Sequence, residues 1–549
     1  MRSKLALLFA LTLFACARDE RAPLGEAAVD ENKPQDGGTV IRRLESDVNT
    51  LNPILAQSKY DRYVDNYIFT PLVYLDANLR PVAALAKSWE IAPDGHTYTF
   101  HLNEKATFSD GTPVLASDVV WTLSKIADPS GGATQLAGDF ENLDLSRTKA
   151  TDAHTVVVAF KQQLAAQLVR FNDLNILPEH VYSKGDFKND YNFKAVGSGP
   201  YRLVSADPQK EIVVDRREDY WGQKPYLKTV VFKVITDVVT AWNALKHGDI
   251  DETNITSDVW QMESHRPELQ RRLEFRRFYT LNYNFVGWNE KNPLFQDKRV
   301  RRALGMCLDV PSIINNLYHG TARAMSGPFT PDEYAYNPAV PVLAYNPLAA
   351  KELLNNAGWF DTNNDGLLDK GGKPFQFDMY VFAGSVSGAQ FGQVFQQELK
   401  KVGVQLNVVQ LDPAQLFKHV LAGDYQAVYM GWQLDAEPDL YATFHSTQFP
   451  PKGQNLVYYS NPVVDQLITQ ARTELDFNKR KALLEQLHAV LSADQPYTWT
   501  IQVSEKWAIS RHLHGVKESR GYGLFTWYPG EFDWWIPRDE RMHDRPARK

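Results

Sequence analysis

The sequence contains very little cysteine: Cys16 and Cys307 are its two cysteines among 549 residues. A disulfide is excluded unless Cys16 is unmodified, and we expect hydrophobic cores alone to hold the folded chain together. Long runs of like charge are also missing, and 59 basic residues stand against 66 acidic ones. With no basic stripe or patch in the pattern, the composition argues against a nucleic-acid partner.

The short motifs that mark common catalytic sites are absent as well. Residues 384–388 (GSVSG) have valine at the centre, so they do not form a G-x-S-x-G nucleophile elbow. Residues 197–200 (GSGP) lack the lysine and the glycine spacing of a phosphate-binding loop. The 13 histidines are scattered without metal-ligand spacing. We therefore predict no enzyme, with a secreted hydrolase kept as the alternative.

The N-terminus has the pattern of an export signal. Arg2 and Lys4 precede a largely apolar stretch over residues 5–14, which is too short to span a bilayer. The stretch ends in LFAC, which resembles a bacterial lipobox, so residues 1–15 are predicted to be a signal peptide and Cys16 to be lipidated. The alternative is cleavage by an ordinary signal peptidase, with Cys16 incidental.

Residues 16–36 are polar and show neither helical nor strand periodicity. Such a segment is typical of a flexible tether. We therefore expect an exported, periplasmic protein that is anchored to a membrane through Cys16.

Alternating strand and helix patterns predict an α/β protein. An early pair lies before about residue 285 and a longer series after it, which indicates two α/β lobes that face each other across a cleft. In the later series, parallel pairing with right-handed crossovers is expected. The expected segments of this series are strand 375–381, helix 391–402, strand 404–408, helix 415–421 and strand 426–432.

One loop resembles a calcium-binding loop. Asp361, Asn363, Asp365 and Asp369 place oxygen ligands at alternating positions, with glycine at the sixth place. The glutamate usual at the twelfth place is replaced by Gly372. A structural Ca²⁺ is therefore one prediction, and the alternative is a polar loop whose Asp and Asn side chains hold turns. We expect no other cofactor.

A set of short motifs, in a fixed order along the chain, resembles the family 5 extracellular solute-binding proteins. These are the oligopeptide, dipeptide and nickel receptors of ABC importers, and the resemblance covers nearly all of residues 38–530. The motifs include LAKSW at 85–89, DGHTYTFHL at 94–102, FSDGTP at 108–113, GSGPY at 197–201, LKHGDID at 245–251, AGW at 357–359 and YSNP at 459–462.

The resemblance implies the type II periplasmic-binding-protein fold, in the cluster with an extra subdomain, and a ligand cleft between two lobes. It also implies a monomer that captures peptides and delivers them to ABC permease subunits by hinged lobe closure. A receptor for an oligosaccharide or a metal chelate is the alternative. The lobes are expected at 37–74, 195–283 and 510–549 (N-lobe), 75–194 (extra subdomain) and 284–509 (C-lobe).

In peptide-binding members of this family, an Asp on a C-lobe loop pairs with the α-amino group of the ligand. Trp432 and Asp435 match the spacing of that motif within GWQLDAEPD, and Asp439 is the second candidate because the following segment is one residue shorter. The residues alone agree, since Asp435 follows a strand end, where open α/β sheets bind ligands. The alternatives are core packing for Trp432 and a cap or turn for Asp435.

A second contact segment is expected on the N-lobe. Gln57, Ser58 and Lys59 follow the first strand and resemble the N-lobe contact segment of the family. The resemblance therefore predicts ligand contacts from both lobes.

Overall fold

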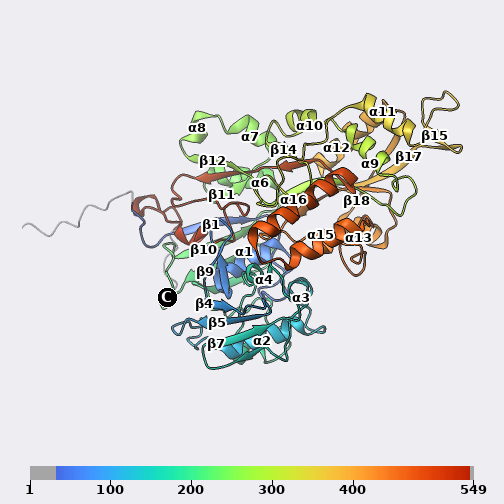
Figure 1. The fold of residues 1–549 in the computed structure, drawn as a ribbon. Helices are drawn as coiled ribbons and strands as arrows, with labels where there is room; N and C mark the ends of the chain where they lie inside the picture. Colours follow the sequence, from blue (N-terminus) through green and yellow to red (C-terminus); the bar gives the residue numbers. More distant parts are fainter. Residues whose placement is uncertain (1–32, 544–549) are drawn as a thin grey trace, which may run out of the picture.

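The computed structural model describes residues 33–543. Two large sheets define an N-lobe and a C-lobe, and a smaller sheet forms a subdomain below the N-lobe in Figure 1. None of the helices in this described part of the chain has the length and apolar character needed to cross a bilayer.

The N-lobe is built on a seven-stranded mixed sheet. β1 lies inside it and pairs in parallel with β10 and β11, while the other pairs are antiparallel. In spatial order the strands are β12 (Leu273–Phe278), β22 (Glu505–Ser510), β11 (Glu252–Asn254), β1 (Thr39–Leu44), β10 (Thr229–Val234), β9 (Glu211–Arg216) and β8 (Tyr201–Asp207). Its helices are α1 (Lys59–Ile68), α6 (Val238–His247), α7 (Ser257–Glu263) and α8 (Pro267–Gln270).

The subdomain is an antiparallel sheet covered by short helices. Tyr98, Phe100 and Leu102 alternate inward along its second strand, as period-two patterning predicts for a half-buried strand. The strands are, in order, β4 (Ala86–Ile91), β5 (Thr97–Leu102), β7 (Thr155–Ala159) and β6 (Lys149–Ala150). The helices are α2 (Ala116–Ala127), α3 (Thr134–Asp139), α4 (Gln167–Arg170) and α5 (Glu179–Tyr182).

The C-lobe contains the predicted strand-helix-strand-helix-strand unit. β17 pairs in parallel with both β18 and β19, which confirms the parallel pairing expected from the sequence. The strands are, in order, β18 (Gln405–Leu411), β17 (Gln376–Phe382), β19 (Ala427–Gln433), β13 (Asn282–Trp288) and β20 (Tyr497–Trp499). The helices are α9 (Lys298–Met306), α10 (Val310–Leu317), α11 (Pro347–Asn356), α12 (Val386–Lys400), α13 (Pro413–Ala422), α14 (Tyr441–Phe444), α15 (Pro462–Thr473) and α16 (Phe477–Asp494).

Short elements complete the fold. Two-stranded ribbons join β2 (Val73–Leu75) to β3 (Pro81–Ala83), β14 (Ala322–Ala324) to β21 (Ile501–Val503), and β15 (Asp369–Lys370) to β16 (Lys373–Pro374). Two 3₁₀ turns lie near the C-terminus, at Gly530–Asp533 and Arg538–Glu540.

Within residues 33–543 the chain passes between the two large sheets twice. It leaves the N-lobe at residues 279–281, between β12 and β13, and returns at residues 500–504, between β20 and β22. The two crossings touch, because the Gln502 side-chain amide donates a hydrogen bond to the Thr280 carbonyl at 2.7 Å. Two adjacent crossings are the covalent arrangement that a hinge needs.

These crossings shift the expected lobe boundaries by a few residues. The C-lobe was expected to extend to residue 509, but β22 pairs with β11 and β12 in the N-lobe sheet. The N-lobe was expected to extend to residue 283, but β13 begins at Asn282. The apolar pattern of a strand shows that it is buried, and pairing partners far away in sequence decide which sheet it joins.

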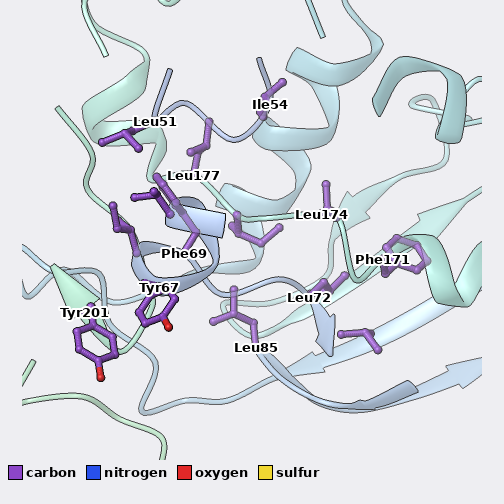
Figure 2. Close-up of a cluster of buried hydrophobic side chains, with 14 of the residues drawn as sticks. Leu51, Ile54, Tyr67, Phe69, Leu72, Leu85, Phe171, Leu174, Leu177 and Tyr201 are labelled. Atoms are coloured by element: carbon purple, nitrogen blue, oxygen red, sulfur yellow. The ribbon is translucent and has the colours of Figure 1, made fainter. Parts of the chain in front are cut away.

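The N-lobe and the subdomain share one continuous hydrophobic core, which fixes the position of the subdomain. Figure 2 shows Tyr67 and Phe69, of α1 and its C-terminal end, in one cluster of buried side chains that extends through Leu174 to Phe171 of the subdomain. The C-lobe has separate cores on the two faces of its sheet. The lobes are therefore packed as distinct bodies.

Candidate functional site

Two cavities lie where the lobes meet. The inner cavity, of about 230 Å³, is enclosed by α1, the subdomain, the crossing at 279–281, and residues 521–526. The outer cavity, of about 720 Å³, lies between the subdomain and the C-lobe. Gln433, Leu434 and Asp435, at the end of β19, line both. The end of this strand is therefore the junction of the two cavities.

Helix α1 presents one polar face to the inner cavity. Its opposite face, with Val64, Tyr67 and Ile68, is buried in the shared core. This orientation follows from the 3.6-residue period, which puts positions three and four apart on one side. The cavity-lining residues of α1 are Lys59, Arg62, Tyr63, Asp65 and Asn66.

A subdomain loop supplies a second wall of the inner cavity. Phe171 and Leu174 are fully buried and point into the core seen in Figure 2. The two residues between them, Asn172 and Asp173, line the cavity. Packing of the flanking apolar residues therefore holds the Asp173 carboxylate at the cleft.

Asp435 lies in the loop after β19, as expected. Its carboxylate is open to the cavity, and in residues 33–543 it makes no hydrogen bond or ion pair. Its side chain is exposed to solvent in the cleft. The protein around it partly removes the carboxyl from water, and this, followed by the charge of Asp173, raises its pKa above the ordinary value, although Arg170 opposes the shift. An unpaired carboxylate in such a place favours a cationic partner.

Asp439 is in the same loop but is already paired. Its Oδ2 atom accepts hydrogen bonds from Arg170 Nη2 and Arg472 Nε, each at 3.0 Å. Its Oδ1 atom accepts the backbone N–H of Tyr441 at 3.1 Å. Because Arg170 belongs to the subdomain and Arg472 to α15, Asp439 bridges the subdomain and the C-lobe.

Trp432 packs against the C-lobe core and also lines a cavity, and its role as a ligand contact stays a prediction. It is half-buried and lines the outer cavity. Its ring lies nearly parallel to Phe285, with centroids 6.2 Å apart, and its Nε1 atom donates to Tyr497 Oη at 3.3 Å.

In the N-lobe segment at 57–59, one residue caps a helix and another lines the inner cavity. Ser58 caps α1: its Oγ accepts the Asp61 backbone N–H at 3.1 Å, and its own N–H donates to Asp61 Oδ2 at 3.1 Å. Lys59 lines the inner cavity, with Nζ 3.6 Å from Glu45 Oε1. Burial alone would lower the pKa of Lys59, but Tyr63 and Glu45 hold it above the usual range. Gln57 is not among the residues lining either cavity.

The loop at 361–369 uses its polar side chains in turns. Asp361 accepts the backbone N–H groups of Asp365 and Gly366 at 3.2 and 3.0 Å, and Asn363 accepts that of Asp365 at 3.1 Å. Asp369 accepts from Thr362 at 2.9 Å. Across residues 33–543, no three His, Cys, Asp or Glu side chains are grouped to hold a metal. The Ca²⁺ site remains a prediction.

The two cysteines are in different situations. Cys16 is outside the described residues, so the lipidation prediction remains untested. Cys307 is fully buried in the C-lobe core, and burial raises the pKa of its thiol to about 12. A thiol with that pKa is unreactive at neutral pH.

Several cleft residues were missed by the sequence reasoning. Arg62, Tyr63 and Asn66 of α1 carried a signal, because they recur at helical spacing with the predicted Lys59. Asp173 and Asn175 carried none, because they lie in a loop that only tertiary packing brings to the cleft.

The two-lobed fold with an inter-lobe cleft defines the class of bilobal solute-binding receptors. The profile described as "Bacterial extracellular solute-binding proteins, family 5 Middle" matches residues 80–455, and the chain belongs to this family. The members of this family are receptors and not enzymes.

The relatives and solved structures match over most of the chain. The oligopeptide-binding protein AppA of Bacillus subtilis (strain 168) is 29% identical over 98% of both chains. The dipeptide-binding protein of Escherichia coli (strain K12) is 25% identical over 76% of this chain and 79% of its own. The structure of AppA from Bacillus subtilis with a nonapeptide superposes with a TM-score of 0.78 at 28% identity, over 92% of this chain and all of that one.

Proposed function

We propose that this protein captures peptides outside the cell membrane and delivers them to an ABC importer. The observation that carries the proposal is the unpaired Asp435 carboxylate at the junction of the two inter-lobe cavities. An ammonium group entering this site forms a charge-assisted hydrogen bond that is strong where water is scarce. Its relatives named for oligopeptide and dipeptide binding support the same ligand class.

The site chemistry favours a peptide over an oligosaccharide. Sugars need neutral polar groups beside aromatic platforms, whereas Asp435, Asp173 and Asp65 line the inner cavity with carboxylates. The outer cavity leaves room for the rest of an extended chain. In this arrangement the amino end of the peptide lies at Asp435.

Binding of native ligand tests the proposal directly. Protein purified from its own host without denaturation should carry peptides that mass spectrometry identifies, and calorimetric titration with those peptides should show one-to-one binding without cleavage. Turnover of the peptides by the pure protein would contradict the receptor role, and so would a co-purified ligand without a free amine.

Lobe closure belongs to the same proposal. The two adjacent crossings at 279–281 and 500–504 are the hinge, and peptide binding in the cleft favours the closed arrangement. Small-angle X-ray scattering should give a smaller radius of gyration with saturating peptide than without. An unchanged radius would show that the lobes do not move.

The membrane anchor is the remaining part of the proposal. Two acyl chains or more on Cys16 give stable anchoring, because each buried methylene adds about 0.8 kcal/mol. Cys16→Ser should move the protein from the membrane fraction to the soluble fraction. Wild-type protein without added lipid mass would refute the anchor and leave peptide capture untouched.

A further inference from the structure

The inner cavity contains a buried carboxylate that peptide-amine binding at Asp435 does not use. Asp65 lines the cavity from α1 and is 1% exposed. Neither of its side-chain oxygens has a hydrogen-bond partner among residues 33–543. Burial, and then the nearby Asp61, raise its pKa well above the ordinary value. A buried polar group without a partner is costly and rare, so it marks a place that a ligand completes.

Two more oxygen-bearing side chains line the same cavity. Asn175 is 8% exposed, and its Oδ1 atom is also without a partner in the described chain. Asp173 reaches the cavity from the adjoining loop, and no hydrogen bond to its carboxylate is found in residues 33–543. These three acceptors come from the N-lobe and its subdomain, whereas Asp435 comes from the C-lobe.

The charges that line the inner cavity do not balance. Lys59 and Arg62 are the cations of its lining, and Lys59 is near Glu45. Against them stand the four carboxylates of Asp65, Asp173, Asp435 and Glu505. Glu505 already accepts the Trp507 indole N–H at 2.9 Å. Four carboxyl groups against two cations leave two without a cation of the lining, one for the peptide amine and one for a second positive charge. A cation that enters beside Asp65 would favour the ionised form of that carboxyl.

An aromatic wall adjoins these carboxylates. The rings of Tyr63 and Phe525 are 5.3 Å apart, and those of Phe525 and Trp507 are 4.9 Å apart. All three line the inner cavity, as does Tyr522. Aromatic faces suit the methylene stem of a long cationic side chain and attract its charged end.

We infer that Asp65, Asp173 and Asn175 form a second cationic subsite, which takes the positively charged side chain of the first residue of the ligand. The inference rests on the proposed function and names its ligand class: peptides that begin with lysine or arginine. Asp435 binds the α-amine from the C-lobe, and the subsite binds the side-chain cation from the N-lobe side.

Two matched peptide series test the subsite. One series begins with lysine and the other with norleucine, which keeps the hydrocarbon stem and lacks the ammonium; both continue with alanine to total lengths of two to nine residues. Calorimetric titration at pH 7 should show the lysine peptide binding about 10- to 100-fold more tightly than its norleucine partner, as expected for hydrogen bonds to a charged group.

Asp173→Asn is the decisive variant, because Asp173 is open to the cavity and its loss leaves the core intact. It should bring the lysine-to-norleucine ratio close to one while the norleucine peptide keeps its affinity. Asp152→Asn is the matched control: it removes an exposed carboxylate of the subdomain that lines neither cavity, and it should keep the wild-type ratio. Asp65→Asn should act like Asp173→Asn if it folds.

The outcomes separate the two proposals. Equal affinity for lysine and norleucine peptides in the wild type would overturn the subsite and leave peptide capture standing. An equal loss of preference in Asp152→Asn and Asp173→Asn would also overturn it, because the preference would then come from the overall charge of the protein and not from a local subsite. If neither series binds at any length, the proposed function fails, and the subsite fails with it.

Discussion

Asp435 and Asp439 lie in one loop and have opposite surroundings. Asp435 faces the two cavities without a partner, whereas Asp439 is held by Arg170 and Arg472 at 3.0 Å each. One carboxylate is therefore free to bind a ligand, and the other ties the subdomain to the C-lobe. The comparison teaches that the motif gives the loop its acidic residues, while the neighbours of each residue decide its role.

The largest effect on peptide affinity is expected from substitution of the free carboxylate, Asp435. Asp435→Ala should weaken peptide binding by about two to three and a half decades, because the ligand ammonium enclosed in the closed cleft would lose its charged partner, and such a loss costs about 3–5 kcal/mol. Asp435→Asn should be nearly as damaging, and N-terminal acetylation of the peptide should mimic both. Calorimetric titration measures these affinities. Normal binding by Asp435→Ala, or equal binding of acetylated peptide, would remove the amine-anchor role.

Substitution of the paired carboxylate, Asp439, should lower the stability of the protein more than it changes peptide recognition. Asp439→Ala removes the hydrogen bonds from Arg170 and Arg472, each worth about 1.5–3 kcal/mol. These arginines keep the longer ion pairs with Asp139 at 3.8 Å and Glu141 at 3.4 Å. We expect a lower unfolding temperature and a larger radius of gyration without ligand. The ratio of affinities for free and acetylated peptide should be unchanged. A collapse of that ratio would mean that Asp439, and not Asp435, anchors the amine.

The pH dependence of stability tests whether Asp139 and the neighbouring cleft carboxylates lack enough cations to neutralise them. Burial, and then Asp173 and Asp435 against the opposing Arg170 and Arg62, raise its pKa to about 7. Between about pH 4 and pH 7 the folded state therefore holds a proton that the unfolded state has lost, so this group makes stability fall as pH rises.

Asp139→Asn should remove that contribution, which cannot exceed about 1.4 kcal/mol per pH unit for one group. Denaturant unfolding of wild type and variant at pH 4, 5.5 and 7 measures the difference. Parallel stability curves for the two proteins would show that Asp139 titrates normally.

The smallest effect is expected at Trp432, which lies between the outer cavity and the C-lobe core. Trp432→Phe keeps the ring beside Phe285 and loses the hydrogen bond to Tyr497 Oη. The expected loss of stability is about 0.5–1.5 kcal/mol, with peptide affinity changed less than tenfold. A loss of affinity as large as that of Asp435→Ala would instead make the indole a principal ligand contact.

Much of the fold could be predicted from local pattern. The alternation over residues 375–432 specified β17, α12, β18, α13 and β19, because periods of 2.0 and 3.6 are imposed by backbone geometry. The boundary at 509 could not be placed, because β22 follows the C-lobe strands in sequence and pairs in the N-lobe sheet.

The site could be predicted only in part. Trp432, Asp435 and Lys59 line the cavities, and the motif together with the strand end was enough to find them. Ser58 was also singled out, but its hydroxyl caps α1. A cap and a ligand contact share the same residue type, so the sequence could not separate them.

The sequence by itself determined the family, the alternation of elements and the loop that carries the two acidic residues. These follow from short-range periodicity and from motifs with fixed spacing. Only the tertiary structure decided which carboxylate is free, because Arg170 is far from Asp439 in sequence and reaches it through the packed subdomain. It also brought Asp65, Asp173 and Asn175 into one cavity, since electrostatic partners are set by distance in space and not by order along the chain.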